Sequence, residues 1–385
     1  MIFQKSFLTL TFTLFSFLPP ISQSEDLSPW GNMSPKKIYL EAPSASLSYF
    51  PRPSYRPVWK FPESQSEEIK AFLLTILTPE EVKYLENSEV GIQQLEGEVR
   101  VYPTVSFIRQ LSREKKRKIY QKLAQYRANP FHYQPVFLHA DSVEEWFGNN
   151  RLPASSIALL KELAYPIGSS LAFSDVSAFL SISGSVAQEE SYWKALSRNY
   201  SMIIELAVDE GTDLEALKNY WTIDGRLESA TIIFETFTRD GGKTTFDINQ
   251  MLPSIPRKYY NSFPTLRSGA AGTFPNGFWT SLNFFSFLPD PAFSDWTEVI
   301  PYLKKRYSPA EEPYRYGDLI LFRSPSMDRP VHACVYLADD LVFTKNGISI
   351  LEPWVIMHLP HVIDRFSVRE LPEVQVWRRN PPSQQ

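Results

Sequence analysis

Cysteine is almost absent from this chain of 385 residues, since Cys334 is the only one. A single cysteine cannot form an internal disulfide, so stability must come from packing, and no zinc site with several cysteine ligands is available. Glycine is sparse, with 15 residues against 31 prolines, which predicts many stiff connections. Neither sign of charge dominates, because 39 basic and 43 acidic side chains leave a net charge of −4. This balance argues against a general attraction to nucleic acid or anionic lipid.

Long apolar runs are missing beyond the N-terminus. Residues 7–18 form an apolar run of about a dozen residues, whereas a membrane-spanning helix needs roughly 20. Pro19 and Pro20 end the run, and Ser22–Ser24 supplies small residues of the kind that signal peptidases read. We predict a signal peptide over residues 1–24 and an exported protein, periplasmic, secreted or in the cell envelope, with no membrane span after signal removal. An uncleaved anchor is the alternative.

Composition divides the remaining chain into three parts. Residues 25–65 are rich in proline and serine and have no sustained periodicity, which predicts a semi-extended linker. The alternative is that its aromatic residues pack on the folded body, namely Tyr49, Phe50, Tyr55, Trp59 and Phe61. Residues 66–250 carry mostly helical patterns, which predicts a mixed, mainly helical domain whose role the sequence does not indicate. Residues 255–385 combine an apolar helix with strand patterns. The predicted fold class is therefore α+β.

Local signals predict individual elements within residues 66–250. At Thr78 a threonine is followed by proline and two acids, the pattern of a helix start. Residues 230–248 fit either a helix or a hairpin, because they combine β-branched residues with an apolar helical spacing. Helices are predicted at 66–77, 112–126, 143–147, 155–163, 189–196 and 214–221, and strands at 99–102 and 201–208.

Three motifs follow one another in the last part of the chain. Residues 274–285 (FPNGFWTSLNFF) are typical of a loop that enters an apolar helix. Residues 316–322 (YGDLILF) are typical of a turn followed by a buried strand, and residues 332–347 of a hairpin with a tight acidic turn. A helix is therefore followed by at least three strands.

These motifs resemble those of NlpC-type papain-like cysteine peptidases, which act as cell-wall amidases or endopeptidases. That family has a cysteine at a helix N-terminus, a Gly-Asp-Leu turn before a strand, and a histidine in an H-x-x-x-Y-hydrophobic pattern on the next strand. Residues 317–319 match the turn, and His332 with Tyr336 matches the histidine strand. The resemblance implies a papain-like fold over residues 255–385, with a helix packed on a small antiparallel sheet.

The resemblance implies a site around His332, with Thr344 or, as the weaker choice, Asn346 as the polar residue that orients the imidazole. In the family, a thiolate is stabilised by the helix N-terminus and the histidine holds its proton. Here the nucleophile position is Gly277, which has no side chain, so we interpret the site as degenerate. Cys334 is a weak alternative nucleophile, because residues two apart on a strand stand roughly 7 Å from each other. We interpret it as a small buried hydrophobe.

Other histidines give no metal-site prediction. Two histidines and an aspartate have the spacing of ligands on one helix face, but Pro360 interrupts that helix and no fourth ligand is evident. A polar helix face is our interpretation of His358, His361 and Asp364, and we treat a second group, His132, His139 and Asp141, as equally weak. No cofactor is predicted.

Three functions remain open. The first is an exported envelope protein whose degenerate peptidase domain binds a peptide, such as a peptidoglycan stem peptide, without cleaving it. The second is an active amidase or endopeptidase that uses Cys334 or a hydroxyl in a rearranged site. The third is a structural envelope protein. A structure without an open cleft beside Gly277 and His332 would favour it. We rank them in that order; nothing in the sequence indicates a nucleic-acid partner or an oligomeric state.

Overall fold

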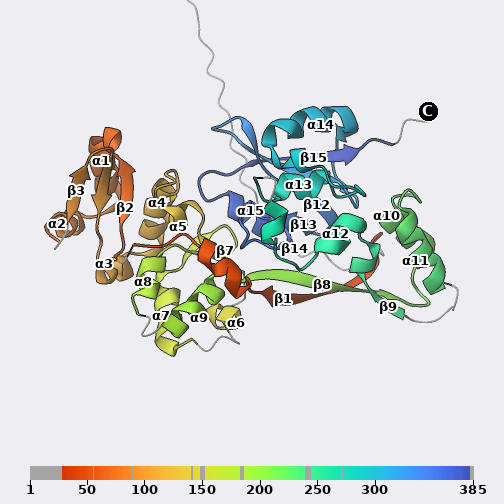
Figure 1. The fold of residues 1–385 in the computed structure, drawn as a ribbon, viewed down its shortest axis with the longest axis horizontal. Helices are drawn as coiled ribbons and strands as arrows, with labels where there is room; N and C mark the ends of the chain where they lie inside the picture. The colour runs from red at the N-terminus through yellow and green to blue at the C-terminus, as the bar shows by residue number, and fades with distance from the viewer. Residues whose placement is uncertain are drawn as a thin grey trace, which may run out of the picture.

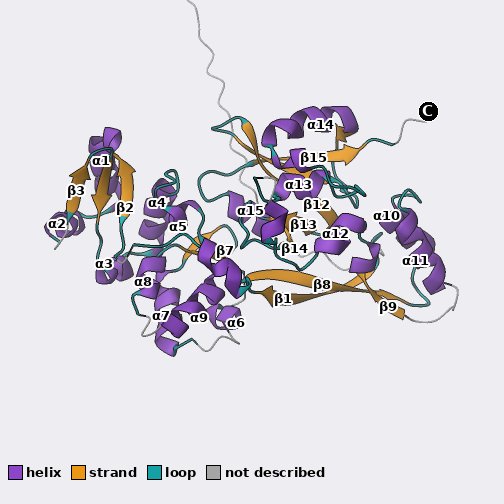
Figure 2. Ribbon diagram, in the orientation of Figure 1, coloured by secondary structure: helices purple, strands orange, loops and turns teal. Residues whose placement is uncertain are grey.

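The structure is a computed structural model that describes most of the chain (Figure 1). The described residues are 28–54, 56–88, 91–139, 142–147, 152–182, 186–238, 244–269 and 272–381. The predicted signal peptide, residues 1–24, lies outside them. The α+β class is confirmed at the coarse level, because helices alternate with small antiparallel sheets (Figure 2). Within the described ranges, no helix has the length and apolar character needed to span a bilayer.

A small sheet with its own helices lies at one end of the molecule, on the left of Figure 1. Its strand order is β2–β4–β3. Thr78 begins α2 with a capping box, in which its backbone N–H donates to Glu81 Oε2 (2.7 Å) and its hydroxyl accepts from Glu81 N (3.2 Å). The predicted helix start is thus confirmed. The bounds are β2 Trp59–Pro62, η2 Glu63–Gln65, α1 Ser66–Ile76, α2 Pro79–Asn87, β3 Ile92–Leu95, β4 Glu98–Val101 and α3 Val105–Gln110.

A group of short helices around the sheet β5–β7–β6 follows. Its core is aromatic, since Trp146, Phe173, Phe179 and Tyr192 are fully buried. The helices predicted in this region are confirmed with small changes at their ends. The bounds are α4 Arg113–Leu123, α5 Pro130–Tyr133, β5 Val136–Leu138, α6 Val143–Phe147, α7 Ala154–Leu163, β6 Tyr165–Ile167, β7 Ser170–Phe173, α8 Val176–Leu180 and α9 Val186–Leu196.

A long antiparallel ribbon runs from these helices along the C-terminal part of the molecule (Figure 1). In this ribbon β1 pairs with β8 over its whole length, with Asn32 opposite Ala207 and Leu40 opposite Asn199. β9 extends the sheet on the other side of β8. The ambiguous residues 230–248 supply both a helix end and a strand. The bounds are β1 Asn32–Leu40, η1 Ser44–Tyr49, β8 Asn199–Val208, α10 Leu214–Thr222, α11 Glu228–Thr238, β9 Thr244–Asp247 and η3 Ile248–Met251.

Of the two predictions for residues 25–65, packing of aromatics on the folded body fits the described part of the segment, and a semi-extended linker does not. β1 forms a sheet edge there, and Trp59 and Phe61 of β2 are each only 1% exposed. An edge strand tolerates Pro35, because one of its sides has no ladder hydrogen bond to lose. The partner of β1 lies far along the chain, so no local sequence pattern reveals the pairing.

The C-terminal part is built on a six-stranded antiparallel sheet with the order β10–β15–β11–β12–β13–β14. As predicted, the helix that begins at Gly277 packs against two of its strands, β12 and β13. The predicted hairpin is confirmed, with Asp339 in the left-handed conformation (φ 55°) at its turn. The bounds are α12 Ser254–Tyr259, η4 Leu266–Gly269, α13 Gly277–Leu282, η5 Pro291–Ser294, η6 Trp296–Glu298, α14 Val299–Arg306, β10 Tyr307–Pro309, β11 Leu319–Ser324, β12 Arg329–Ala338, β13 Leu341–Lys345, β14 Trp354–His358, α15 Leu359–Phe366 and β15 Glu373–Arg379.

The ribbon is bonded to the edge of this sheet. In β8, the Ser201 hydroxyl accepts from the Ile356 backbone N–H (3.1 Å), and the Tyr200 hydroxyl accepts from the His358 backbone N–H (3.0 Å). Both donors belong to β14, the edge strand, so side chains of β8 satisfy part of an edge that has no strand partner on that side. β8 therefore connects the helical middle of the chain with the C-terminal sheet.

Candidate functional site

The structure brings Gly277 and His332 into direct contact. α13 begins at Gly277, and the Asn276 side chain caps it by accepting from the Trp279 backbone N–H (3.0 Å). A Cβ atom built at Gly277 would lie 2.3 Å from both Cε1 and Nδ1 of His332, and 2.7 Å from the Ala333 carbonyl oxygen. The position that the sequence identifies as the lost nucleophile therefore faces the Nδ1 edge of the imidazole.

The other imidazole nitrogen, Nε2, is hydrogen-bonded to Thr344, which is in turn bonded to Asn346. We call these three residues the His332 row. His332 Nε2 lies 3.0 Å from Thr344 Oγ1, and that hydroxyl donates to Asn346 Oδ1 (3.0 Å). Because the Thr344 hydroxyl gives its proton to Asn346, it accepts from Nε2–H, which leaves Nδ1 as the unprotonated nitrogen that faces Gly277. The sequence offered Thr344 and Asn346 as alternatives; in the structure they act in series, with Thr344 next to the imidazole.

The imidazole is buried and stacked. His332 is 2% exposed, and its ring centroid lies 4.0 Å from that of Phe366 and 5.5 Å from that of Phe322, in nearly parallel planes. Burial lowers the pKa of His332 to about 3, and the positive charges of Arg365 and Lys345 act in the same direction. The ring is therefore neutral at physiological pH, and Phe366 of α15 covers it.

Cys334 and the hydroxyls of Thr280 and Ser281 are not placed for attack. Cys334 is fully buried, and burial raises the pKa of its thiol well above its usual range. Thr280 is buried inside α13, where its hydroxyl donates to the Asn276 carbonyl (2.8 Å) and accepts from Trp354 Nε1 (2.9 Å). Ser281 is buried as well. None of these three groups presents a reactive atom to solvent.

The Gly-Asp-Leu turn, residues 317–319, has a structural role. Gly317 has φ +88°, and a Cβ there would lie 2.4 Å from Phe285 Cζ, so only glycine fits. Asp318 accepts two hydrogen bonds from Arg378, at 2.9 and 2.7 Å, and one from the Arg315 backbone N–H at 2.9 Å. This bidentate ion pair fixes the turn before β11 to the neighbouring strand β15.

A cavity of about 280 Å³ adjoins the Asn346 end of the row. One wall comes from the C-terminal part and the other from α5, β5 and the start of β8. Three arginines and one glutamate give this cavity a net positive lining: Arg198, Arg365, Arg369 and Glu352. Arg365 donates to Glu352 (2.6 Å), and the Arg369 guanidinium lies 4.3 Å from the ring centroid of Tyr133. Sequence reasoning missed these arginines, because nothing local marks residues that meet across two parts of the chain.

Lys345 supports the loop that lines this cavity. Its ammonium is fully buried and donates to the carbonyl oxygens of Gly347 (2.7 Å) and Ser349 (2.9 Å). Burial lowers the pKa of Lys345 to about 7, although the nearby Glu352 carboxylate opposes the shift. The conformation of this loop therefore depends on Lys345, the last residue of β13, whose ammonium group holds two carbonyl oxygens of the loop.

The predicted polar face of α15 is instead an internal contact. The rings of His361 and His139 stack at 4.7 Å, and Asp364 accepts from the hydroxyls of Ser169 (2.8 Å) and Ser170 (2.7 Å). Asp364 is buried because α15 packs on the middle part of the chain, which sequence periodicity cannot show. His358 pairs with Asp340 (2.7 Å).

The second histidine group is also internal where it is described. Burial lowers the pKa of His132 to about 3, and that of His139 falls well below its ordinary value for the same main reason. Asp141 lies outside the described residues. Among the residues that the structure describes, no group of three or more metal-ligating side chains is arranged to hold an ion.

Comparison of the chain with family models, with curated proteins and with solved structures found no match. The resemblance to NlpC-type peptidases therefore depends on the sequence motifs and on the geometry around His332. That geometry includes the helix start at Gly277, the orientation of Nδ1 toward it, and the hydrogen bond from Nε2 to Thr344.

Proposed function

We propose that this is an exported cell-envelope protein whose C-terminal part is a degenerate papain-like, NlpC-type domain that binds a peptide without cleaving it. One observation carries the proposal. The Nδ1 edge of His332 faces Gly277, while Thr344 holds Nε2 at 3.0 Å. This arrangement supports an interpretation in which Gly277 takes the place of the nucleophile, His332 that of the base and Thr344 that of the orienting residue of a cysteine peptidase.

The chemistry of the row argues against cleavage. Glycine supplies no nucleophile, so the His332 imidazole, which burial keeps neutral, has no thiol beside it to deprotonate. Cys334 cannot replace the missing thiol, because burial keeps it protonated. An active peptidase with a rearranged site is therefore the less supported reading.

The peptide site follows from the cavity at the Asn346 end. Phe366 covers the imidazole, so a ligand meets the neighbouring cavity of about 280 Å³. Guanidinium groups form paired hydrogen bonds with carboxylates. Arg198 is already bonded to Glu41 and Arg365 to Glu352, so Arg369, whose guanidinium lies over the Tyr133 ring, is the cavity arginine with which a ligand carboxylate can pair. A short acidic peptide, such as a peptidoglycan stem peptide, has this chemistry.

The test is calorimetric titration of the folded chain with a synthetic stem tetrapeptide, followed by mass spectrometry of the mixture. Arg369→Gln removes a cavity guanidinium, whereas Arg113→Gln changes an exposed arginine at the start of α4 and serves as the matched control. We expect binding without any cleaved product, and a loss of about tenfold in affinity for the first variant only. Cleavage by the natural chain, or equal effects of both variants, would overturn the proposal.

A second candidate is a purely structural envelope protein. The observation that favours it is the closure of the cleft by Phe366, whose ring centroid lies 4.0 Å from that of His332. A structural role predicts no peptide binding and no effect of Arg369→Gln beyond stability. The same titration therefore separates the two candidates.

A further inference from the structure

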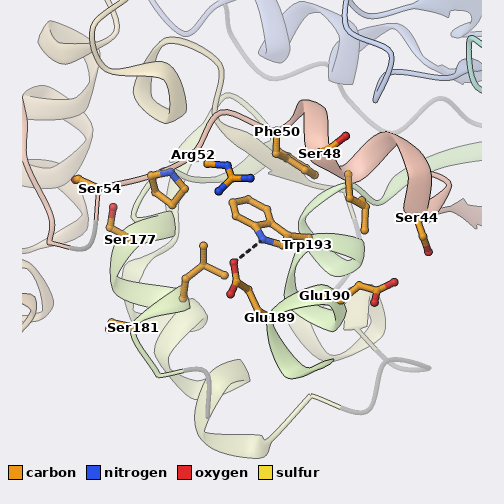
Figure 3. A pocket seen from close by; sticks show the side chains of 13 residues that line it. Ser44, Ser48, Phe50, Arg52, Ser54, Ser177, Ser181, Glu189, Glu190 and Trp193 are labelled. Atoms are coloured by element: carbon orange, nitrogen blue, oxygen red, sulfur yellow. Dashed lines mark hydrogen bonds between the residues drawn. The ribbon is translucent and has the colours of Figure 1, made fainter. Parts of the chain in front are cut away.

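A second cavity, of about 520 Å³, opens beside the helical middle of the chain (Figure 3). It is bordered by η1, by the proline-containing segment that continues to Ser54, by α8 and by α9. Its volume falls in the range of about 300–1,000 Å³ that is typical of small-molecule sites. Its lining shares Phe50 with the cavity beside Asn346, but none of the residues of the His332 row.

The aromatic side chain of Trp193 lies at the centre of this cavity. Figure 3 shows the Trp193 indole between Arg52 and Glu189. Its ring centroid lies 4.8 Å from that of Phe50, and its Nε1 donates to Glu189 Oε1 at 3.2 Å. Trp193 is half-buried, so part of the indole remains open to the cavity. The two contacts fix its orientation before any ligand arrives.

The rim around the indole is polar and of mixed sign. Hydroxyls can both donate and accept, whereas a carboxylate only accepts, so the rim calls for a ligand with many donors. One oxygen of Glu189 accepts from Trp193, and a carboxylate has capacity for further donors. The Ser44 hydroxyl and Lys194 lower the pKa of Glu190, which keeps it ionised. The rim groups are Ser44, Ser48, Ser54, Ser177, Ser181, Arg52, Glu189 and Glu190.

We propose that this cavity binds a saccharide. One face of a pyranose ring carries C–H groups that pack on the open part of the Trp193 indole, and the ring hydroxyls donate to Glu189 and exchange hydrogen bonds with the rim serines. The proposal goes beyond the peptide-binding function and does not depend on it, because the residues that carry it lie outside the cavity beside Asn346.

Other ligand classes fit the cavity less well. The hydroxyls of Ser48, Ser54 and Ser181 already donate to backbone carbonyls, so toward a ligand they act as acceptors, which a wholly apolar ligand does not use. A proline-rich peptide also docks on aromatic grooves, but its backbone offers carbonyl acceptors and few donors, so it cannot satisfy Glu189 and Glu190. A simple anion would meet two carboxylates against one guanidinium, that of Arg52.

The experiment is calorimetric titration of the natural chain with chitotriose and cellotriose, and with a nonaproline peptide as the competing class. Trp193→Ala removes the indole, and Glu189→Gln keeps the shape of the side chain while removing its charge. Trp296→Ala is the matched control, because Trp296 is a 40% exposed tryptophan that does not line the cavity. Circular dichroism confirms that each variant is folded.

We expect at least one trisaccharide to bind with millimolar or tighter affinity. Trp193→Ala should weaken binding about tenfold or more, Glu189→Gln about threefold or more, and the control less than twofold. Should Trp193→Ala fail to fold, Glu189→Gln decides the outcome. Absence of saccharide binding, equal losses in Trp193→Ala and the control, or binding of nonaproline alone would overturn the proposal.

Discussion

The imidazole of His332 fills the space that a side chain at position 277 would need. It is fixed there by Thr344 on one edge and by the Phe366 ring on one face. The Ala333 carbonyl closes the same space from the backbone side. At the scale of residues, position 277 therefore has no room for the side chain that a nucleophile there would require.

Gly277→Ala should destabilise the fold by about 1–3 kcal/mol, because the added methyl group would overlap the His332 ring, which is stacked on Phe366, and the Ala333 backbone carbonyl. Urea unfolding measures this change. Gly211→Ala is the control, since a Cβ there would have only Asp209 Oδ1 near it, at 3.5 Å. Equal free energies of unfolding for the two variants would contradict the packing that we describe.

Acid should destabilise the protein partly through His332. Its pKa is about 3 in the folded chain against an ordinary value of 6.5, so only the unfolded chain takes up this proton as the pH falls through that window. The stabilising contribution is complete above pH 6.5 and is lost toward pH 3. His332→Asn should reduce the slope of the unfolding free energy between pH 4 and 6 by up to about 1.4 kcal/mol per pH unit. The slope that His132 contributes remains in both proteins and cancels in the comparison.

At the scale of elements, α15 acts as a cover. Its Phe366 packs on the imidazole, and its Asp364 is buried against Ser170 of β7 and the preceding Ser169. Neither contact follows from the helical pattern, which predicts only a polar face. Because Phe366 also lines the cavity beside Asn346, this one helix separates the histidine from that cavity.

Phe366→Ala should bring water to His332 and move its pKa from about 3 toward the ordinary value of 6.5. An NMR titration of the imidazole resonances measures the shift. The variant Phe287→Ala, which removes a phenylalanine that is 83% exposed, should leave the pKa unchanged. An unaltered His332 titration in Phe366→Ala would show that the ring is buried by other groups.

The sequence predicts those elements whose signals lie within a few neighbouring residues. The capping box of α2, the helix start at Gly277 and the acidic turn between β12 and β13 were all accessible, because each depends on residues within a few positions. Thr344, which lies 12 residues from His332, was proposed instead from the resemblance to NlpC-type peptidases. The arginines of the cavity and the pairing of β1 were not accessible, since their partners lie in other parts of the chain.

At the scale of the whole molecule, β8 is one of the elements that join the middle of the chain to the C-terminal part. It pairs with β1 and β9, and through Tyr200 and Ser201 it bonds the edge strand β14. The middle and C-terminal parts share this strand, so we expect them to unfold together.

Ser201→Ala should cost about 1–3 kcal/mol, because it leaves the buried Ile356 N–H without its acceptor. Ser308→Ala removes a hydroxyl bonded to Asn380 at an exposed position and should change the stability little. Calorimetry of both variants gives the comparison. Two separate transitions in the natural chain, one of them unaffected by Ser201→Ala, would contradict a shared folding unit.

The pairing of β1 has a consequence for how the chain is made. β1 leaves the ribosome early, yet its partner residues Asn199–Ala207 follow only after most of the helical middle has been synthesised. At about 5–20 residues per second, this interval lasts on the order of ten seconds. During that time β1 has a free edge and no partner, so the nascent chain is open to wrong pairing. We therefore expect wrong pairing of β1 during this interval to lower the yield of folded protein.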